Sequence, residues 1–330
     1  MAPHPPPDVA GVLQACAEAA EACVLEARSG QRREVAPDGN LDRRRLDERQ
    51  HAAHGLAWAA AYAETLRQTA DWARRLQSQG VLNEASARPA LLLAHEYLAQ
   101  LAGGLPMSQG EMARPADLGF DARRLAPLIA DLAPHGGSPA RARIVELLAQ
   151  ARGTPALETS GLDETHAGIQ AQFTRFAAER IAPHAHGWHV RDELIPLELI
   201  AELSDLGVFG LTLPEDHGGA GLGKVAMCIV SEALSRGYIG VGSLGTRSEI
   251  AAELILAHGT DAQKARWLPA IASGAVLPTA VFTEPESGSD LASLRTRAER
   301  HGDSWRINGA KTWITHAARA DLMTLLARTD

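Results

Sequence analysis

The 330-residue sequence has few cysteines and no spacing that would support a disulfide framework. Cys16 and Cys23 lie in an alanine-rich stretch with helical periodicity, and Cys228 is far from both. We therefore expect Cys16 and Cys23 to share one buried helix face as reduced thiols. Unpaired thiols of this kind are typical of a reducing cytosol.

The sequence also has no excess of basic charge and no long apolar run, and its first residues do not resemble a leader. A formal net charge of -8 argues against nucleic acid or an anionic membrane as the main partner, because both bind clustered Lys and Arg. No apolar run is long enough to span a bilayer, and Met1 to Pro7 is too polar and proline-rich for a signal peptide. We expect a cytoplasmic protein with no membrane insertion and no nucleic-acid partner.

Residues 8–160 have the pattern of successive helices. An apolar stripe recurs at steps of three and four residues from Val9 to Ala27, and a turn is expected at 38–40. Gly80 ends the next, longer helix, whose apolar face is formed by Trp58, Tyr62, Leu66, Thr69, Trp72 and Leu76. Three more helices are expected over 91–101, 125–132 and 144–148. With no strand signal, residues 1–155 are expected to form a helical bundle that ends in a linker at 152–155.

The second part begins with helices and then changes period. Helices are expected over 169–181 and 196–206. After Ala275 short β-type runs follow at 276–283, 294–300, 305–307, 311–315 and 322–328, with a turn at 301–303. Asn308-Gly309 is a strong two-residue hairpin signal. The expected fold class is mainly α with a partial β domain.

Three ordered segments in this second part form a distinctive set. They are Leu206-Gly-Val-Phe-Gly-Leu-Thr-Leu-Pro-Glu-Asp-His-Gly-Gly-Ala-Gly-Leu222, Gly259-Thr-Asp-Ala-Gln-Lys-Ala-Arg-Trp-Leu-Pro-Ala-Ile-Ala-Ser-Gly274, and Phe282-Thr-Glu-Pro-Glu-Ser-Gly-Ser-Asp290 followed by Ile307-Asn-Gly-Ala-Lys-Thr-Trp-Ile-Thr315. At this spacing the chain resembles the acyl-CoA dehydrogenase family. The resemblance implies that family's N-terminal helical domain at 163–277 and an incomplete start of its middle β domain at 278–330.

The third segment carries the chemistry. Gly288 permits close approach of the backbone to a ligand, and Ser289 offers a hydroxyl and an N–H to a phosphate or amide. The resemblance implies FAD as cofactor, with Ser289 lying between the FAD pyrophosphate and the pantetheine arm of the substrate. Thr283 and Trp313 would lie at the flavin ring and Thr315 would hydrogen-bond near its N5. The full cofactor-binding set is Phe282, Thr283, Ser289, Trp313, Ile314 and Thr315, and Ser289 also binds substrate.

Two positions depart from the pattern of many relatives. Ala280 stands where relatives often carry a larger residue at the flavin edge, and His316 stands where many have Asn. His316 is either a polar contact near the flavin or a strand-end residue, and we favour the strand end. Glu284, Glu286 and Asp290 lie near the expected flavin, but the resemblance makes them loop-forming residues instead of bases.

Two other motifs have simpler explanations. Gly218 to Val225 nearly matches a phosphate-binding loop, but Val225 replaces the Ser or Thr that would hold magnesium, so we expect a turn-rich loop. His184, His186 and His189 do not fall on one helix face and Pro183 precedes them, so a solvated helix end is expected instead of a zinc site.

In most of the family a glutamate in a C-terminal helical domain removes the α-proton of the substrate. No such residue is identified before Asp330, so no catalytic residue is assigned, and we expect this chain to be an inactive fragment of a longer enzyme. The resemblance further implies an acyl-CoA substrate, an electron-transfer flavoprotein as acceptor, and a homo-oligomer.

The helical extension and Trp313-Ile-Thr-His-Ala-Ala-Arg319 resemble the branch of the family that oxidises methylsuccinyl-CoA to mesaconyl-CoA in the ethylmalonyl-CoA pathway. The extension either docks its Trp58/Tyr62/Trp72 face on the missing C-terminal domain, partly covering the active site or stabilising the oligomer, or forms an independent bundle. Two other functions remain open. One is a non-catalytic interaction module that retains an enzyme-derived scaffold, and the other is an acyl-CoA oxidase or flavin monooxygenase of the same fold.

Overall fold

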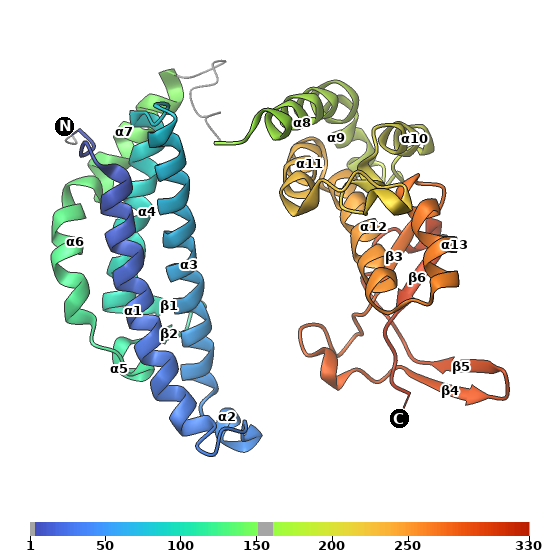
Figure 1. The fold of residues 1–330 in the computed structure, drawn as a ribbon, viewed down its shortest axis with the longest axis horizontal. Coiled ribbons are helices and arrows are strands. Elements are labelled where there is room, and N and C mark those ends of the chain that lie inside the picture. Colours follow the sequence, from blue (N-terminus) through green and yellow to red (C-terminus); the bar gives the residue numbers. More distant parts are fainter. Residues whose placement is uncertain (1–3, 151–160, 330) are drawn as a thin grey trace. The chain divides into compact units, whose positions relative to one another are not determined.

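The computed structural model describes residues 4–150 and 161–329. The chain forms two compact units, Met1–Gly161 and Leu162–Asp330 (Figure 1). The linker predicted at 152–155 lies outside the described residues.

Helices make up most of the first unit, as the periodicity predicted. They are α1 Val9–Val35, α2 Arg43–Glu48, α3 Gln50–Ser78, α4 Glu84–Gly103, α5 Pro115–Leu118, α6 Ala126–Leu132 and α7 Gly137–Gln150. Local side chains define their starts: the carboxylate of Asp8 accepts a hydrogen bond from the Gly11 amide, and Asn83 forms a reciprocal capping box with Ser86. The backbone turns left-handed at Gly80 (φ 68°), just after α3 ends.

The core of the first unit lies mainly between α1 and α3, which run side by side (Figure 1). Small buried residues line both helices, so their backbones can approach closely: Ala17, Ala20, Cys23 and Ala27 on α1, and Ala59, Ala63, Ala70 and Ala73 on α3. On the predicted aromatic face of α3, Tyr62 is buried and stacks on Tyr97 of α4 with ring centroids 3.9 Å apart. This face therefore packs at least partly within its own bundle.

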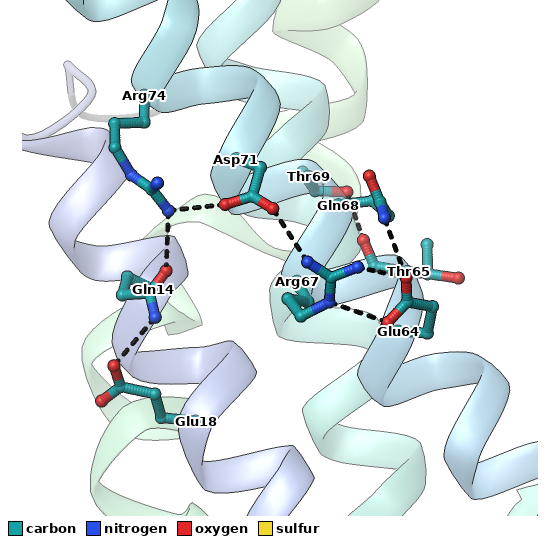
Figure 2. Close-up of polar contacts among 9 residues, drawn as sticks. All are labelled: Gln14, Glu18, Glu64, Thr65, Arg67, Gln68, Thr69, Asp71 and Arg74. Atoms are coloured by element: carbon teal, nitrogen blue, oxygen red, sulfur yellow. Dashed lines mark hydrogen bonds and ion pairs between the residues drawn. The ribbon is translucent and has the colours of Figure 1, made fainter. Parts of the chain in front are cut away.

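The exposed side of α3 carries a chain of polar contacts that reaches α1 (Figure 2). Arg67 pairs with Glu64 (2.6 Å) and Asp71 (3.0 Å), and Arg74 bonds both Asp71 (2.6 Å) and Gln14 of α1 (3.2 Å). Exposed pairs of this kind contribute little to stability because water competes for the charges. They identify the solvent face of α3, opposite the alanine-lined core.

One prediction for the first unit was wrong, because a short sheet is present. Strand β1 Leu105–Pro106 pairs antiparallel with β2 Met112–Ala113. The connecting turn closes through a 2.9 Å bond from the Met107 amide to the Glu111 carbonyl. Two-residue strands are too short to produce an alternating pattern in the sequence, so periodicity does not detect them.

We expect one of the three cysteines to react with a thiol reagent at pH 8 in the folded chain, and all three in urea. Cys16 and Cys23 are fully buried on α1, as predicted, and burial raises the pKa of each thiol to about 11. The thiolate is the reactive form, so both are protected, whereas Cys228 is exposed. Titration with Ellman's reagent, with mass spectrometry of the labelled peptides, measures this. Labelling of Cys16 in the folded chain would contradict the packing of α1.

Helices also open the second unit. They are α8 Glu164–Phe176, α9 Ala182–Val190, α10 Leu197–Asp205, α11 Gly223–Gly237, α12 Ile239–His258 and α13 Asp261–Ala272. A π-helical turn, Ala177–Ile181, joins α8 to α9, and the predicted helix at 169–181 falls within α8 and this turn. Phe209, Leu203 and Leu244 are among the buried side chains that form the core between these helices.

The strands follow the helices, so the predicted fold class is confirmed. Strand β3 Pro278–Val281 pairs in parallel with β6 Leu322–Leu325, and β4 Arg297–His301 pairs antiparallel with β5 Ser304–Asn308. The predicted turn at 301–303 is present between β4 and β5. Strand β3 ends at Val281, so Thr283 follows the strand and is not its last residue.

Two β-type predictions were wrong. Asn308-Gly309 does not form a hairpin turn, because β5 ends at Asn308 and the chain then passes close to Thr296. A Cβ on Gly309 would lie only 2.3 Å from the hydroxyl of Thr296, so this glycine serves close approach instead of a turn. Residues 311–315 are not a strand, since Trp313 has a left-handed backbone (φ 57°) that breaks the extended conformation.

Within residues 4–150 and 161–329, no helix is long and apolar enough to cross a membrane.

Candidate functional site

Two segments that are distant in sequence lie side by side just beyond β3. One is the Phe282–Glu284 segment and the other is the Lys311–Thr315 segment. The amide of Thr312 donates to the carbonyl of Thr283 (3.0 Å), and the ammonium of Lys311 donates to the carbonyl of Phe282 (2.9 Å). The structure thus brings together five of the six residues predicted to bind a cofactor: Phe282, Thr283, Trp313, Ile314 and Thr315.

The side chains of these segments leave polar groups free. Within the described chain, the hydroxyls of Thr283 and Thr315 have no hydrogen-bond partner, and the indole of Trp313 is 89% exposed. The sixth predicted residue, Ser289, lies in an exposed loop, and its hydroxyl likewise has no partner among these residues. Three free hydroxyls and an exposed aromatic ring are suited to a planar ligand that combines polar edges with a flat face.

A buried ion pair lies between the two segments. The ammonium of Lys311 is 2.9 Å from the carboxylate of Glu284, with 9% and 6% of the two side chains exposed. Glu284 also accepts bonds from the amide (2.9 Å) and hydroxyl (2.6 Å) of Thr296 and from the amide of Arg295 (2.7 Å). These contacts hold the pKa of Glu284 at about 2, and the hydrogen bond from the Thr296 hydroxyl makes the largest contribution. A carboxylate so firmly ionised and fully bonded is a poor general base.

The other two acids of this loop have surface contacts. Glu286 pairs with Arg295 at the surface (2.5 Å), and Asp290 accepts a bond from the hydroxyl of Ser293 (2.5 Å). Neither lies against a free nucleophile or another acid in these contacts. Their geometry is that of loop-forming residues.

A cavity of about 210 Å³ lies beside Thr315. The start of α12 contributes Gly240, Ser243 and Leu244, and the 315–319 segment contributes Thr315, His316 and Arg319. Arg247 lies one turn beyond Ser243 on the same face of α12. Glu193, which pairs with Arg191 (2.6 Å), lines the cavity as well, so both acidic and basic side chains lie beside Thr315.

Two arginines near this cavity have no acidic partner. Arg319 donates to the carbonyl of Ile195, and Arg247, whose Nε is buried, has no hydrogen-bond or ion-pair partner among the described residues. Sequence reasoning missed both. Arg247 is the single charged residue between Ile239 and Ser248, but nothing in that stretch indicates that it lacks a partner. A half-buried cation without a counter-charge is a site for an anionic ligand group.

His316 lies at the edge of the same cavity. Its Nε2 is 3.1 Å from the carbonyl of Pro278 and its Nδ1 is buried without a partner. Burial, with the charges of Arg247 and Arg319, lowers the pKa of His316, so the neutral ring with Nε2–H donating to the carbonyl is favoured. The backbone is left-handed there (φ 41°), so His316 is not a strand end.

The two motifs set aside from the sequence have ordinary contacts. Lys224 begins α11 and pairs with Glu249 (2.7 Å) and Glu253 of α12, which leaves it unavailable to a phosphate. His184, His186 and His189 are exposed on α9, and no metal-binding group of three or more residues exists within the described ranges.

Comparison with known families gives two matches, which together span half of the chain. Residues 163–275 match the acyl-CoA dehydrogenase N-terminal domain, and residues 279–330 match the acyl-CoA dehydrogenase middle domain.

Individual relatives are similar over different lengths. A (2S)-methylsuccinyl-CoA dehydrogenase of Cereibacter sphaeroides is 57% identical over 94% of this chain and 57% of its own length. The mitochondrial isovaleryl-CoA dehydrogenase of Bos taurus is 35% identical over 52% of this chain and 41% of its own length. A crystal structure of a glutaryl-CoA dehydrogenase from Mycobacterium smegmatis in complex with FADH2 is 36% identical and covers 51% of this chain and 44% of that one, with a TM-score of 0.49. The chain spans about half the length of the curated relatives that it matches.

The two domain matches follow each other in the order of the helices and strands, and the second includes the segments around Thr283 and Thr315. The chain belongs to the acyl-CoA dehydrogenase family.

Proposed function

We propose that this chain is the part of an FAD-dependent acyl-CoA dehydrogenase that binds one side of the flavin, in an enzyme that oxidises methylsuccinyl-CoA to mesaconyl-CoA. Its 57% identity to a (2S)-methylsuccinyl-CoA dehydrogenase extends across the helical extension as well as the two family domains. The first unit would be that extension, 163–277 the N-terminal helical domain, and 278–330 the start of the middle β domain.

The observation that carries the proposal is the pair of segments with free hydroxyls. Thr283 and Thr315 each present an unpaired hydroxyl, and Trp313 presents an exposed ring, on two segments joined by a main-chain bond and by the Lys311 side chain. A flavin ring has a polar edge of nitrogen and oxygen atoms and a flat apolar face. The residues present fit that group, and the free hydroxyl of Ser289 would serve its phosphates or the substrate arm.

The bound FAD would accept the hydride that leaves the β-carbon of the thioester. Thr315 would donate a hydrogen bond to the polar edge of the ring and favour negative charge there. Trp313 would cover the ring and exclude water. Within this chain no acid is assigned to remove the α-proton, and Glu284 is held ionised by its own bonds.

Two arginines without an acidic partner support a dicarboxylic substrate. Methylsuccinyl-CoA carries a free carboxylate in addition to its thioester, so the pocket for its acyl chain must neutralise a charge. Arg319 lines the cavity beside Thr315, and Arg247 lies near enough to lower the pKa of His316. Arg247 and Arg319 would therefore hold the carboxylate next to the flavin segments.

We further propose an electron-transfer flavoprotein as acceptor, a homo-oligomer and a cytoplasmic location. The acceptor and the homo-oligomer are proposed from the resemblance to acyl-CoA dehydrogenases. The acidic composition is compatible with a cytoplasmic location. In the extension, half-buried Trp72 lines a groove with Pro89 and Leu93 of α4. The two hypotheses for the extension are that this face packs against the missing C-terminal domain, or that the extension is an independent bundle.

We expect the protein encoded by the whole reading frame that contains these residues to purify with a flavin absorbance spectrum. Under anaerobic conditions methylsuccinyl-CoA should bleach that spectrum, because the ring takes up hydride. A stopped-flow spectrophotometer measures the bleaching, and butyryl-CoA is the matched substrate without a free carboxylate. If the enzyme released hydrogen peroxide in air as fast as the flavin bleaches, oxygen would be the electron acceptor. The function would then be that of an acyl-CoA oxidase and not of a dehydrogenase. A protein without flavin would leave the interaction module as the function.

A further inference from the structure

The buried pair Glu284–Lys311 lies at the point where several parts of the second unit meet. Glu284 belongs to one proposed flavin segment and Lys311 to the other. Through Thr296, the same carboxylate reaches the approach to β4 and its neighbour Arg328, because the Arg328 amide donates to the Thr296 carbonyl (2.8 Å). Glu284 is thus linked, directly or through Thr296, to segments as far along the chain as Arg328, 44 residues away.

Lys311 makes two bonds, and each reaches the opposite segment. Its ammonium donates to the Glu284 carboxylate and to the Phe282 carbonyl, both at 2.9 Å. The carbonyl of the next residue, Thr283, accepts the amide of Thr312. The two segments are therefore linked by three hydrogen bonds, two from the Lys311 ammonium and one between main-chain groups.

We propose that Glu284 and Lys311 are positioning residues, which hold the two flavin segments at the separation that the flavin ring requires. The inference rests on the proposed function, since it names what the pair does for that site. Neither side chain belongs to the set proposed to contact the flavin. Each acts through the backbone of its neighbours.

The contacts of Glu284 and Lys311 fit a positioning role better than a role in overall stability. Burying an ion pair gains little stability over well-packed apolar residues, because both charges lose their water. A pair held by several hydrogen bonds does fix geometry, and here Glu284 accepts four bonds and Lys311 donates two. Here the bonds of Lys311 are to main-chain and carboxylate atoms of the flavin segment, which leaves the hydroxyls of Thr283 and Thr315 free.

The test uses the full chain and three variants. Lys311→Met removes the link and leaves Glu284 charged. Glu284→Gln with Lys311→Met removes both charges, so that a folding defect caused by an unpaired buried charge is relieved. Lys224→Met is the matched control, because Lys224 also pairs with a glutamate of low exposure in the second unit but joins α11 to α12.

Two quantities are measured for each variant. One is the dissociation constant for FAD, from quenching of flavin fluorescence. The other is the hydrogen-exchange rate of the Thr312 amide, from mass spectrometry or NMR, which needs no FAD. We expect Lys311→Met and the double variant to bind FAD about tenfold or more weakly and to lose protection at Thr312, while Lys224→Met matches the parent.

The outcomes separate the two proposals. If the parent binds no FAD but Thr312 loses protection in both Lys311 variants, the segments are held as inferred and the cofactor assignment fails for this chain. If the double variant regains the parent's FAD affinity and Thr312 protection, the pair only stabilises the fold and the positioning role is overturned. Unchanged exchange at Thr312 in Lys311→Met overturns it as well.

Discussion

Replacing Arg247 with Gln is expected to lower kcat/KM for methylsuccinyl-CoA by about 100-fold. The guanidinium has no partner in the described chain, so a substrate carboxylate placed beside it would gain a charge-assisted hydrogen bond. Bonds to charged groups contribute about 1.5–3 kcal/mol, and each 1.4 kcal/mol corresponds to a factor of ten. The assay uses the protein of the whole reading frame with an artificial electron acceptor.

A substrate without the carboxylate separates recognition from damage. For butyryl-CoA, Arg247→Gln should leave kcat/KM within about threefold of the parent, because no anion is present to lose. Arg266→Gln is the control variant, because it removes an arginine outside the cavity. The Cζ of Arg266 lies 4.3 Å from the ring centroid of Trp267 on α13. Equal losses for both substrates would place Arg247 in the structure of the pocket and not in recognition of the carboxylate.

Replacing Glu84 with Gln is expected to destabilise the first unit by about 3 kcal/mol. Glu84 begins α4 and accepts a 2.6 Å bond from Arg88, whose side chain is only 3% exposed, and two bonds from Arg143 of α7. A neutral amide cannot balance both guanidinium groups, and Arg88 would retain a buried charge without its partner. This loss of stability is at the low end for a broken buried ion pair, because a quarter of the Glu84 side chain is exposed.

The same pair sets a pH dependence. Hydrogen bonds from Arg143 and Arg88 hold the pKa of Glu84 at about 2, below its ordinary 4.5. A depressed carboxyl pKa contributes stability above pH 4.5, and that stability is lost as the pH falls from 4.5 toward 2. Urea denaturation followed by circular dichroism should show this loss in the parent and a smaller one in Glu84→Gln. Glu146→Gln is the control, since Glu146 is mostly exposed and makes one bond to Arg143. Equal midpoints for the two variants would show that Arg88 does not depend on Glu84.

Much of the helical architecture was predictable because it depends on local pattern. The stripe from Val9 to Ala27 predicts the buried face of α1, and Gly80 marks the end of α3. The turn at 301–303 was equally local. Where the pattern was misleading, a contact distant in sequence was the cause: Gly309 is a glycine because Thr296 lies against it, not because the chain turns there.

The family followed from sequence alone, and so did the residues proposed to contact the flavin. Thr283, Ser289, Trp313 and Thr315 stand in a spaced motif, and a motif is preserved in the order of residues along the chain. The structure places five of the six predicted cofactor residues on two adjoining segments, while their role toward FAD remains a proposal. Ser289 lies on an exposed loop.

Only the tertiary structure identified the charged groups that organise this site. The sequence predicted Glu284 only as a loop-forming residue and gave Lys311 no role, yet the two side chains are buried against each other, 27 residues apart. Arg247 and Arg319 come from a helix and from the segment after Thr315, and neither sequence context indicates that they lack a counter-charge. Sequence determines which residues are present and their local periodicity. Desolvation and pairing of a charge depend on which distant segments surround it, and that is decided when the chain folds.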